Sequence, residues 1–236
     1  MAGTHETQCA GFPRIITPYN LAAMPTGTRE LQKHARRRVI LDAARSLILD
    51  GKTRDFSMPE LAQKAGVSLV TPYNLFGSKS SILLEIVRED IFEPVQAIGD
   101  LPGETLVDWI GELSRTLAKI YYRNRHFYRR MIVTLVAQES AESQRESLAL
   151  SYAMFQSVVE RLQARGKLLP AISPATLARH LAHSVSGSLQ HRLMERGTED
   201  GLRGEIETGL LLVLAGVCLP AEHRLLIERI DALDRP

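Results

Sequence analysis

The sequence contains few cysteines and no hydrophobic run long enough to span a membrane. Its 236 residues include two cysteines, Cys9 and Cys218, which are too few for a disulfide framework and lack the spacing of a metal site. Such cysteine usage indicates a reducing compartment. The apolar stretch at 210–219 is too short to cross a bilayer, and residues 1–28 lack the continuous apolar core of a signal peptide. We therefore expect a soluble cytoplasmic protein without a membrane partner.

Motifs of common catalytic sites are absent as well. The sequence has no G-x-S-x-G elbow, phosphate-binding loop, dinucleotide fingerprint or H-E-x-x-H motif. His180 and His183 are one helical turn apart and His191 is two turns further, but no cysteine or carboxylate stands at matching metal-ligand spacing. We interpret them as polar or interface histidines. We expect no catalytic residues, metal or cofactor; an enzyme built from dispersed residues stays open as an alternative.

Neither sign of charge dominates the whole chain, whose formal net charge is +2, but the charges are unevenly distributed. Residues 29–79 carry ten basic and five acidic side chains, a net of +5, whereas residues 80–236 carry 18 basic and 21 acidic ones, a net of −3. This distribution is typical of a nucleic-acid-facing domain joined to one that does not face nucleic acid. The chain is long enough for two such domains.

The segment at 57–79, SMPELAQKAGVSLVTPYNLFGSK, predicts two short helices joined by a tight turn. Ser57 and Glu60 have the spacing of a capping box, so a helix begins just after Ser57. Pro59 falls in its first turn, where a missing amide hydrogen costs nothing. Gly66 ends the helix, because glycine adopts a left-handed conformation without steric cost. Ser68 is then expected to cap a second helix, which is too short to be stable without its neighbours.

This pattern resembles the DNA-binding domain of TetR-family transcriptional regulators. The similarity runs from a first helix with Arg37, Ile40, Leu41, Ala43, Ala44 and Leu47, through Ala65-Gly66-Val67-Ser68, to Tyr73, Phe76 and residues 79–83. It implies an all-α fold, with an N-terminal three-helix domain of the helix-turn-helix type and a C-terminal helical bundle for ligand binding and dimerisation. We accordingly divide the chain into a flexible extension at 1–28, a DNA-binding domain at 29–80 and an effector-binding and dimerisation domain at 81–236.

The resemblance also implies which residues contact DNA. Hydroxyl groups, an ammonium group and helix N-terminal amides suit phosphate contacts, which fix the register without reading sequence. Thr71 and Asn74 are expected to read base edges, and Leu69 and Val70 to contact thymine methyl groups. The full expected set is Arg37, Ser57, Met58, Ser68, Leu69, Val70, Thr71, Tyr73, Asn74 and Lys79. Each has a simpler alternative role as a cap, a packing residue or a solvated charge.

Position 72 departs from the family pattern, because proline stands where an apolar residue usually packs against the helices behind. Pro72 lies near the end of the first turn, where losing one backbone hydrogen bond is partly tolerated, yet it is expected to kink the helix. Thr71, which precedes it, is biased away from helical geometry. The alternative function is therefore an all-α interaction protein, or a nonspecific DNA binder, that keeps the fold without reading an operator.

Downstream of residue 79 the pattern is helical nearly throughout. Ser78 is expected to cap a helix that runs towards Pro94 and joins the two domains. Further helices are expected at 104–123, 126–138, 143–165, 174–196, 204–217 and 221–233, with ends marked by Gly166, Pro174, Gly197 and Pro220.

By resemblance, the helices at 174–196 and 204–217 pair with those of a second copy as a four-helix bundle. The first carries small residues that permit a close approach, and residues 210–217 of the second are apolar on nearly every side. The expected interface residues are Leu177, Leu181, Val185, Leu189, Leu210 and Leu214; the alternative is an ordinary monomer core. A two-fold homodimer would place its recognition helices about 34–36 Å apart, or a multiple of that, and would need a near-palindromic operator in double-stranded DNA.

A small apolar effector is a further expected partner, because TetR-like proteins commonly bind one within the C-terminal bundle. Aromatic and methionine side chains supply apolar surface with polar tips. The expected effector-binding residues are Trp109, Tyr122, Phe127, Tyr128, Met131, Tyr152 and Phe155, with Tyr121 and Met154 of similar character nearby. The alternative is that they are ordinary core residues. Repression is the commoner habit of the family, so we expect a repressor.

Overall fold

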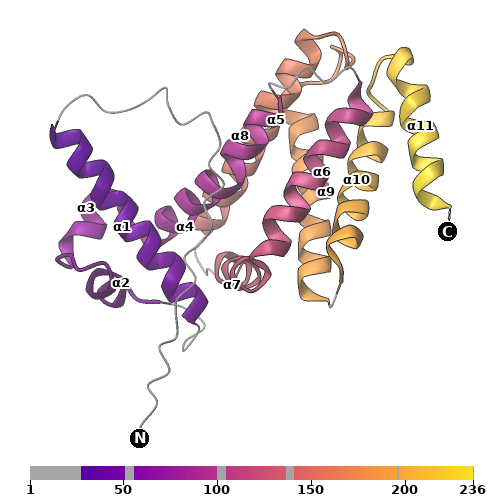
Figure 1. Ribbon diagram of the computed structural model, residues 1–236. Coiled ribbons are helices and arrows are strands. Elements are labelled where there is room, and N and C mark those ends of the chain that lie inside the picture. Colours follow the sequence, from indigo (N-terminus) through magenta and orange to yellow (C-terminus); the bar gives the residue numbers. More distant parts are fainter. Residues whose placement is uncertain (1–27, 51–55, 100–104, 137–140, 196, 236) are drawn as a thin grey trace, which may run out of the picture.

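The computed structural model describes residues 28–50, 56–99, 105–136, 141–195 and 197–235, and these ranges are helical apart from turns and one isolated bridge between Leu168 and Cys218 (Figure 1). The predicted all-α fold is confirmed. In chain order the elements are α1 (Thr28–Asp50), α2 (Met58–Lys64), α3 (Val70–Phe76), α4 (Lys79–Val87), the π-helical segment η1 (Arg88–Phe92), α5 (Glu93–Gly99), α6 (Leu106–Arg123), α7 (Arg125–Val136), α8 (Ala141–Ala164), α9 (Pro174–Met194), α10 (Glu199–Ala215) and α11 (Pro220–Asp234). Within these ranges, no helix combines the length and apolar character that a membrane crossing requires. Residues 1–27, predicted to be part of a flexible extension, lie outside the described ranges.

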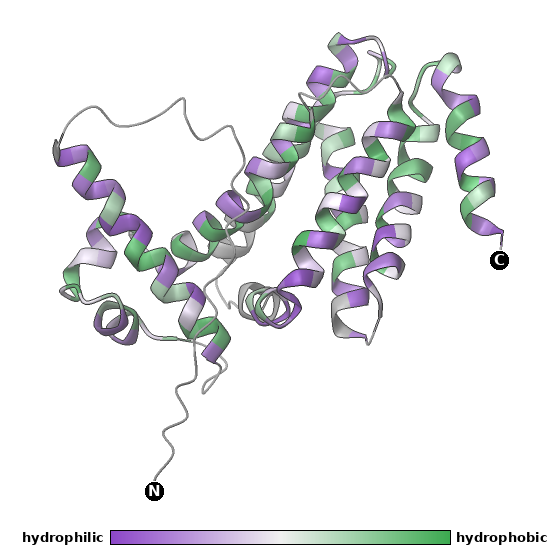
Figure 2. Cartoon of the chain, viewed as in Figure 1, coloured by the Kyte–Doolittle hydropathy of each residue, from purple (hydrophilic) through white to green (hydrophobic). Residues whose placement is uncertain are grey.

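Helices α1, α2 and α3 form a head whose core lies against the second half of α1. Its buried side chains are Ile40, Leu41, Ala44, Phe56, Met58, Leu61 and Ala65. The first half of α1 differs, because residues 29–36 are all exposed. Figure 1 shows this end of α1 projecting at the upper left, and Figure 2 colours most of it as hydrophilic. One half of the helix is therefore core and the other half is surface.

The predicted capping box at the start of α2 is confirmed. The Ser57 hydroxyl accepts a hydrogen bond from the Glu60 amide at 3.3 Å, and the Glu60 carboxylate accepts one from the Ser57 amide at 2.7 Å. The bond from the Ser57 amide is the main cause that lowers the pKa of Glu60. Gly66 follows the helix with φ of +65°, the left-handed conformation predicted for the turn.

A helical rod of α4, η1 and α5 joins the head to the second domain. Ser78 caps it as predicted, since its hydroxyl accepts a hydrogen bond from the Ser81 amide at 3.0 Å. The rod continues past Pro94 to Gly99. In η1 the chain widens into a π turn, where the Glu93 amide donates to the carbonyl of Arg88, five residues back. The wider turn places Pro94 in the first turn of α5, where its missing amide hydrogen is tolerated.

The second domain is a bundle of α6, α8, α9 and α10, with α7 crossing near the head and α11 along the outer side of α10 (Figure 1). Most predicted helix limits agree with the structure to within a few residues. Helix α10 begins earlier than predicted, at Glu199, because the Thr198 hydroxyl caps it by accepting a hydrogen bond from the Gly201 amide. The predicted continuation of α7 to residue 138 lies outside the described ranges.

Two buried carboxylates hold α11 against this bundle. Glu222 accepts hydrogen bonds from the Leu106 amide at 2.7 Å and from the Lys167 ammonium group at 2.6 Å. Glu207 accepts one from the Arg229 guanidinium at 2.6 Å. Buried charges need such partners, and the first amides of a helix lack partners within it. The last helix is therefore an integral part of the domain, tied to the start of α6 and to α10.

The six side chains predicted for the dimer interface lie inside the single chain. Their exposed fractions range from 0% to 6%, and they are Leu177, Leu181, Val185, Leu189, Leu210 and Leu214. The structure places them in the alternative role, an ordinary subunit core, because α8, α9 and α10 turn these faces towards one another. The outward faces of α9 and α10 carry other residues, including His180, His183 and Leu212.

Candidate nucleic-acid interface and internal cavity

The recognition helix α3 and the residue before it present an exposed face. Leu69, Val70 and Tyr73 are exposed to 48%, 60% and 47%, and Asn74 is exposed as well. Large side chains gathered in this way indicate a surface that a partner covers. Three of the four predicted reading residues, Leu69, Val70 and Asn74, therefore lie together with Tyr73, which is predicted to contact phosphate, whereas the fourth, Thr71, is half-buried.

The predicted cap of α3 at Ser68 is wrong. Helix α3 begins at Val70, and no side chain accepts a hydrogen bond from its first amides. The Ser68 hydroxyl instead lies 2.8 Å from the Thr71 hydroxyl, and the Ser68 carbonyl accepts a hydrogen bond from the Thr71 amide at 2.9 Å. The start of α3 is thus fixed by a backbone turn and by packing.

Pro72 is compatible with the helix that contains it. Helix α3 runs from Val70 to Phe76, and Pro72 is its third residue, within the first turn, where the amides lack partners inside the helix. The ring is buried, on the side of α3 opposite the exposed face. Pro72 therefore fills the place in which an apolar residue was expected.

Arg37 holds the end of α3 against α1 and α4. Its guanidinium donates to the Leu75 carbonyl at 2.6 Å and to the Glu85 carboxylate at 3.0 Å, and it lies 4.2 Å from the centroid of the Phe76 ring. Arg88 also donates to Glu85, and this bond is the main cause that lowers the pKa of the Glu85 carboxyl. A seven-residue helix is not stable alone. We call this group of contacts the Arg37 clamp; sequence reasoning missed Glu85, which no local pattern links to Arg37.

The residues predicted to contact phosphate lie around the start of α2 and α4. Ser57 is exposed, although its hydroxyl takes part in the capping box. Met58 is buried. Lys79 is half-buried, with its ammonium nitrogen 4.7 Å from the centroid of the Phe56 ring. These three residues therefore have structural roles besides any contact with DNA.

A second polar group of contacts joins α1 to the rod. Arg45 of α1 donates to Glu89 at 2.9 Å and to Asp90 at 2.8 Å, both in η1. The Tyr128 hydroxyl of α7 donates to Asp90 at 3.3 Å. Burial raises the pKa of Asp90, and the neighbouring Arg45 partly offsets this effect. The head, the rod and α7 meet at this group of charges.

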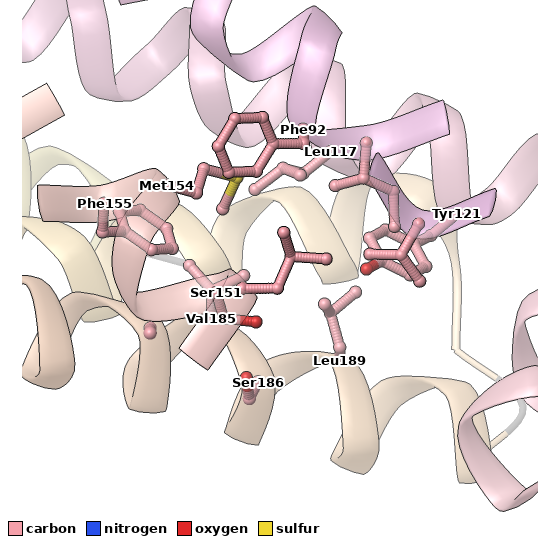
Figure 3. Close-up of a pocket in the computed structure, with 13 residues that line it drawn as sticks. Phe92, Leu117, Tyr121, Ser151, Met154, Phe155, Val185, Ser186 and Leu189 are labelled. Atoms are coloured by element: carbon pink, nitrogen blue, oxygen red, sulfur yellow. The ribbon is translucent and has the colours of Figure 1, made fainter. Parts of the chain in front are cut away.

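An internal cavity lies where the rod meets α6, α8 and α9 (Figure 3). The space between the lining side chains has an empty volume of about 440 Å³, a figure that includes open solvent. The described lining residues are Val87, Ile91, Phe92, Leu117, Tyr121, Leu150, Ser151, Met154, Phe155, Ala182, Val185, Ser186 and Leu189. The lining is apolar except for three hydroxyl groups, those of Tyr121, Ser151 and Ser186.

The predicted effector-binding residues are mostly elsewhere. Phe155 lines the cavity, together with Tyr121 and Met154 from the wider set. Trp109, Phe127, Tyr128 and Met131 are buried core residues, and Tyr122 and Tyr152 are half-buried. Conversely, Val185 and Leu189, predicted for the dimer interface, line the cavity. The predicted set favoured aromatic residues and so missed aliphatic lining residues that come from five elements, α4, η1, α6, α8 and α9.

The histidines singled out from the sequence form polar contacts. His183 Nε2 lies 2.8 Å from the Tyr152 hydroxyl, and His191 Nδ1 lies 3.0 Å from the Glu205 carboxylate. Among the described residues, no group of three or more histidine, cysteine, aspartate or glutamate side chains is placed to hold a metal ion.

Comparison with known families identifies the region that contains the recognition helix. Residues 40–86 match the family model described as bacterial regulatory proteins, tetR family. The match spans the buried half of α1, the helix-turn-helix pair and most of α4. No curated protein sequence matches the chain significantly.

Solved structures share the fold over most of the chain. Thermus thermophilus FadR, a TetR-family transcriptional repressor in complex with lauroyl-CoA, is 23% identical with a TM-score of 0.62, covering 76% of this chain and 94% of that one. A TetR transcriptional regulator from Rhodococcus sp. RHA1 is 20% identical with a TM-score of 0.59, covering 78% and 97%. SmeT, the repressor of the Stenotrophomonas maltophilia multidrug efflux pump SmeDEF, is 20% identical with a TM-score of 0.53, covering 80% and 93%, and was also solved with triclosan. At these identities the likeness shows the fold alone.

Proposed function

The chain belongs to the TetR family of bacterial regulatory proteins, and from this premise we propose that it is a homodimeric repressor that binds a near-palindromic operator and leaves it when a small apolar molecule occupies the cavity. The observation that carries the proposal is the exposed face of α3, held in place by the Arg37 clamp. The protein works in the cytoplasm as a regulator and not as an enzyme, and its action needs no metal or cofactor.

In this proposal the exposed face of α3 enters the major groove. Leu69 and Val70 contact thymine methyl groups, and Asn74 hydrogen-bonds to base edges. Tyr73 and Lys79 bind phosphates, which fix the register of the head on the duplex. Arg37 acts through α3, because its guanidinium already donates to Leu75 and Glu85. The Thr71 hydroxyl contributes less to base reading, because it is paired with the Ser68 hydroxyl.

The dimer is formed by the outward faces of α9 and α10. The six leucine and valine residues first expected there are buried within the subunit and support the helices from behind. The exposed residues His180, His183 and Gly187 on α9 and Leu212 on α10 supply the contact surface. Two copies related by a two-fold axis then present two heads to a palindromic site.

The cavity communicates with the head through contiguous contacts. Tyr121 lines the cavity, and its ring centroid lies 4.7 Å from that of Tyr128. The Tyr128 hydroxyl donates to Asp90, which also accepts a hydrogen bond from Arg45 of α1. Segment η1 additionally supplies cavity-lining residues. An effector that binds more tightly to one position of η1 would shift α1. By thermodynamic linkage, the effector weakens DNA binding by the same factor by which DNA weakens effector binding.

The DNA part of the proposal is tested by selecting DNA from a random-sequence pool with the purified protein at about 0.15 M salt, where nonspecific binding is weak. We expect enrichment of a palindrome. Asn74→Ala should change the base preference at defined positions, whereas Tyr73→Phe should weaken binding evenly across sequences. If the folded, dimeric protein enriches no sequence, operator reading is rejected and the alternative, a nonspecific DNA binder, stands.

The effector part is tested with triclosan, the molecule bound to SmeT, as a probe. Triclosan is apolar with one hydroxyl group, which suits a cavity whose lining is apolar apart from hydroxyl groups. We expect triclosan to raise the melting temperature and to release the selected duplex. Ser186→Leu, which fills the cavity, should abolish both effects, and Ala175→Leu, at an exposed position on α9, should retain them. Equal responses of the two variants would place the binding site elsewhere.

A further inference from the structure

The first half of α1 is a basic helix that the rest of the described protein does not cover. Residues 28–39 contain five basic and one acidic side chain, a net of +4, although the whole chain is only +2. The 224 remaining residues therefore sum to −2. Apart from the half-buried Arg37, residues 29–39 are all exposed. Positive charge is thus concentrated on an exposed helical segment about 18 Å long, at a rise of about 1.5 Å per residue.

Three of the basic residues form a stripe along one side of this helix. Arg29, Lys33 and Arg36 have the spacing i, i+4, i+7, which places them on one face. Ile40 continues the same stripe and is buried in the head. The stripe therefore lies on the side of α1 that faces the head, next to Arg37, which contacts the end of α3.

The charges of the stripe have little to neutralise them within the described protein. Lys33 lies 4.0 Å from Glu30, a pair in which both side chains are more than half exposed. Such a pair contributes little to stability. No hydrogen bond or ion pair joins Arg29 or Arg36 to another described residue. Folding thus does not require this cluster, and its like charges repel one another.

We propose that the stripe of Arg29, Lys33 and Arg36 is a second DNA contact, which binds backbone phosphates beside the half-site that α3 reads. It adds affinity and salt dependence but no sequence information. The inference rests on the proposed function for its partner. The stripe spans about 10 Å, over which a DNA duplex presents about six phosphate charges.

A duplex fits this surface better than an apolar partner does. The face that the stripe occupies carries long cationic side chains, while the exposed apolar Leu31 lies on the opposite side of α1. Because the Arg37 clamp joins α1 to α3, DNA bound by α3 comes close to the stripe without a change of fold. Cationic side chains on an exposed helix bind DNA through its backbone phosphates.

The test compares R29Q/K33Q/R36Q with a matched control, R115Q/K119Q/R123Q. The control removes three exposed cations at similar spacing from α6, and Arg115 pairs with Glu112 just as Lys33 pairs with Glu30. Affinity is measured between about 50 and 200 mM salt, a range over which phosphate contacts weaken strongly. The probes are the selected palindromic duplex and a random-sequence duplex of equal length.

For the α1 variant, the slope of log K against log salt should become shallower by about 0.9 for each lost phosphate contact, hence by up to about five for a dimer. Affinity at the lowest salt should fall at least about tenfold, and the selected sequence should be unchanged. The control should behave like the unmodified protein. A slope equal to that of the control, or an altered selected sequence, would overturn the proposal.

These outcomes separate this inference from the proposed function. If the unmodified protein enriches no palindrome but the α1 variant still flattens the slope on random-sequence DNA, operator reading fails and the stripe remains a DNA contact. If a palindrome is enriched and the slope does not change, the stripe is ordinary solvated surface. Circular dichroism of each variant checks that the exposed substitutions leave the helices intact.

Discussion

The recognition helix and the cavity are held in place by different kinds of interaction. Helix α3 is seven residues long and depends on the Arg37 clamp and on the buried ring of Pro72. The cavity lies between long helices that pack along their length and line it with aliphatic and aromatic side chains. A helix of seven residues is not stable alone and must be held by its neighbours. The head therefore depends on a few identifiable contacts, and the second domain depends on many similar ones.

Helix α1 connects the two regions. Arg37 and Arg45 lie about two turns apart on it, and they bind different partners. Arg37 binds α3 and α4, whereas Arg45 binds η1, whose residues also line the cavity. A displacement of η1 would therefore act on the helix that positions the recognition helix.

The largest effect on stability should come from the second domain. Leu181 is fully buried, so Leu181→Ala should lower the free energy of unfolding by roughly 2–5 kcal/mol, measured by chemical denaturation. Leu212 on α10 is exposed to 60%, and Leu212→Ala should change that free energy by less than about 0.5 kcal/mol while weakening the dimer.

Both variants should be measured at several protein concentrations, because dimer formation contributes to apparent stability. If Leu181→Ala dissociated the dimer without destabilising the subunit, Leu181 would be an interface residue, as the sequence alone suggested.

The head should be sensitive to loss of the Arg37 clamp. Arg37→Met should destabilise the protein by about 1–3 kcal/mol, because it removes charge-assisted hydrogen bonds, and should weaken DNA binding. Glu85→Gln distinguishes positioning from direct contact. If Arg37 positions α3, losing the carboxylate should weaken DNA binding too; if Arg37 itself binds phosphate, losing an acidic neighbour should strengthen binding. Affinity for the selected duplex, measured for both variants, decides between the two roles.

The same comparison explains how much could be predicted from sequence. The capping box at Ser57, the left-handed Gly66 and the cap at Ser78 involve residues a few positions apart, and local spacing predicted them correctly. The partners Glu85 and Asp90 are more than 40 residues from Arg37 and Arg45, and helical periodicity does not identify which buried faces meet. For that reason the helices were predicted well, whereas two residues predicted for the dimer interface, Val185 and Leu189, line the cavity instead.

The contact between α7 and the rod should have a moderate effect. Tyr128→Phe removes the hydroxyl that donates to Asp90 and should lower the free energy of unfolding by about 1 kcal/mol. Tyr122→Phe is the control, since Tyr122 is half-buried on the neighbouring helix and its ring packs against Arg125. If triclosan binds, Tyr128→Phe should also reduce its effect on DNA affinity. Equal stability of the two variants would show that the Tyr128 hydroxyl contributes nothing to the contact.

The smallest effects should separate two serines that the sequence presents as equivalent caps. Ser57→Ala should cost about 1 kcal/mol, because the Glu60 amide loses its acceptor and the capping box is broken. Ser68→Ala should cost less than about 0.5 kcal/mol, because the hydroxyl of the exposed Ser68 pairs only with the Thr71 hydroxyl and caps no amide of α3. Thermal and denaturant unfolding of both variants measure the difference. Equal losses would mean that Ser68 does cap α3, and that this short helix is held by local signals as well as by the Arg37 clamp.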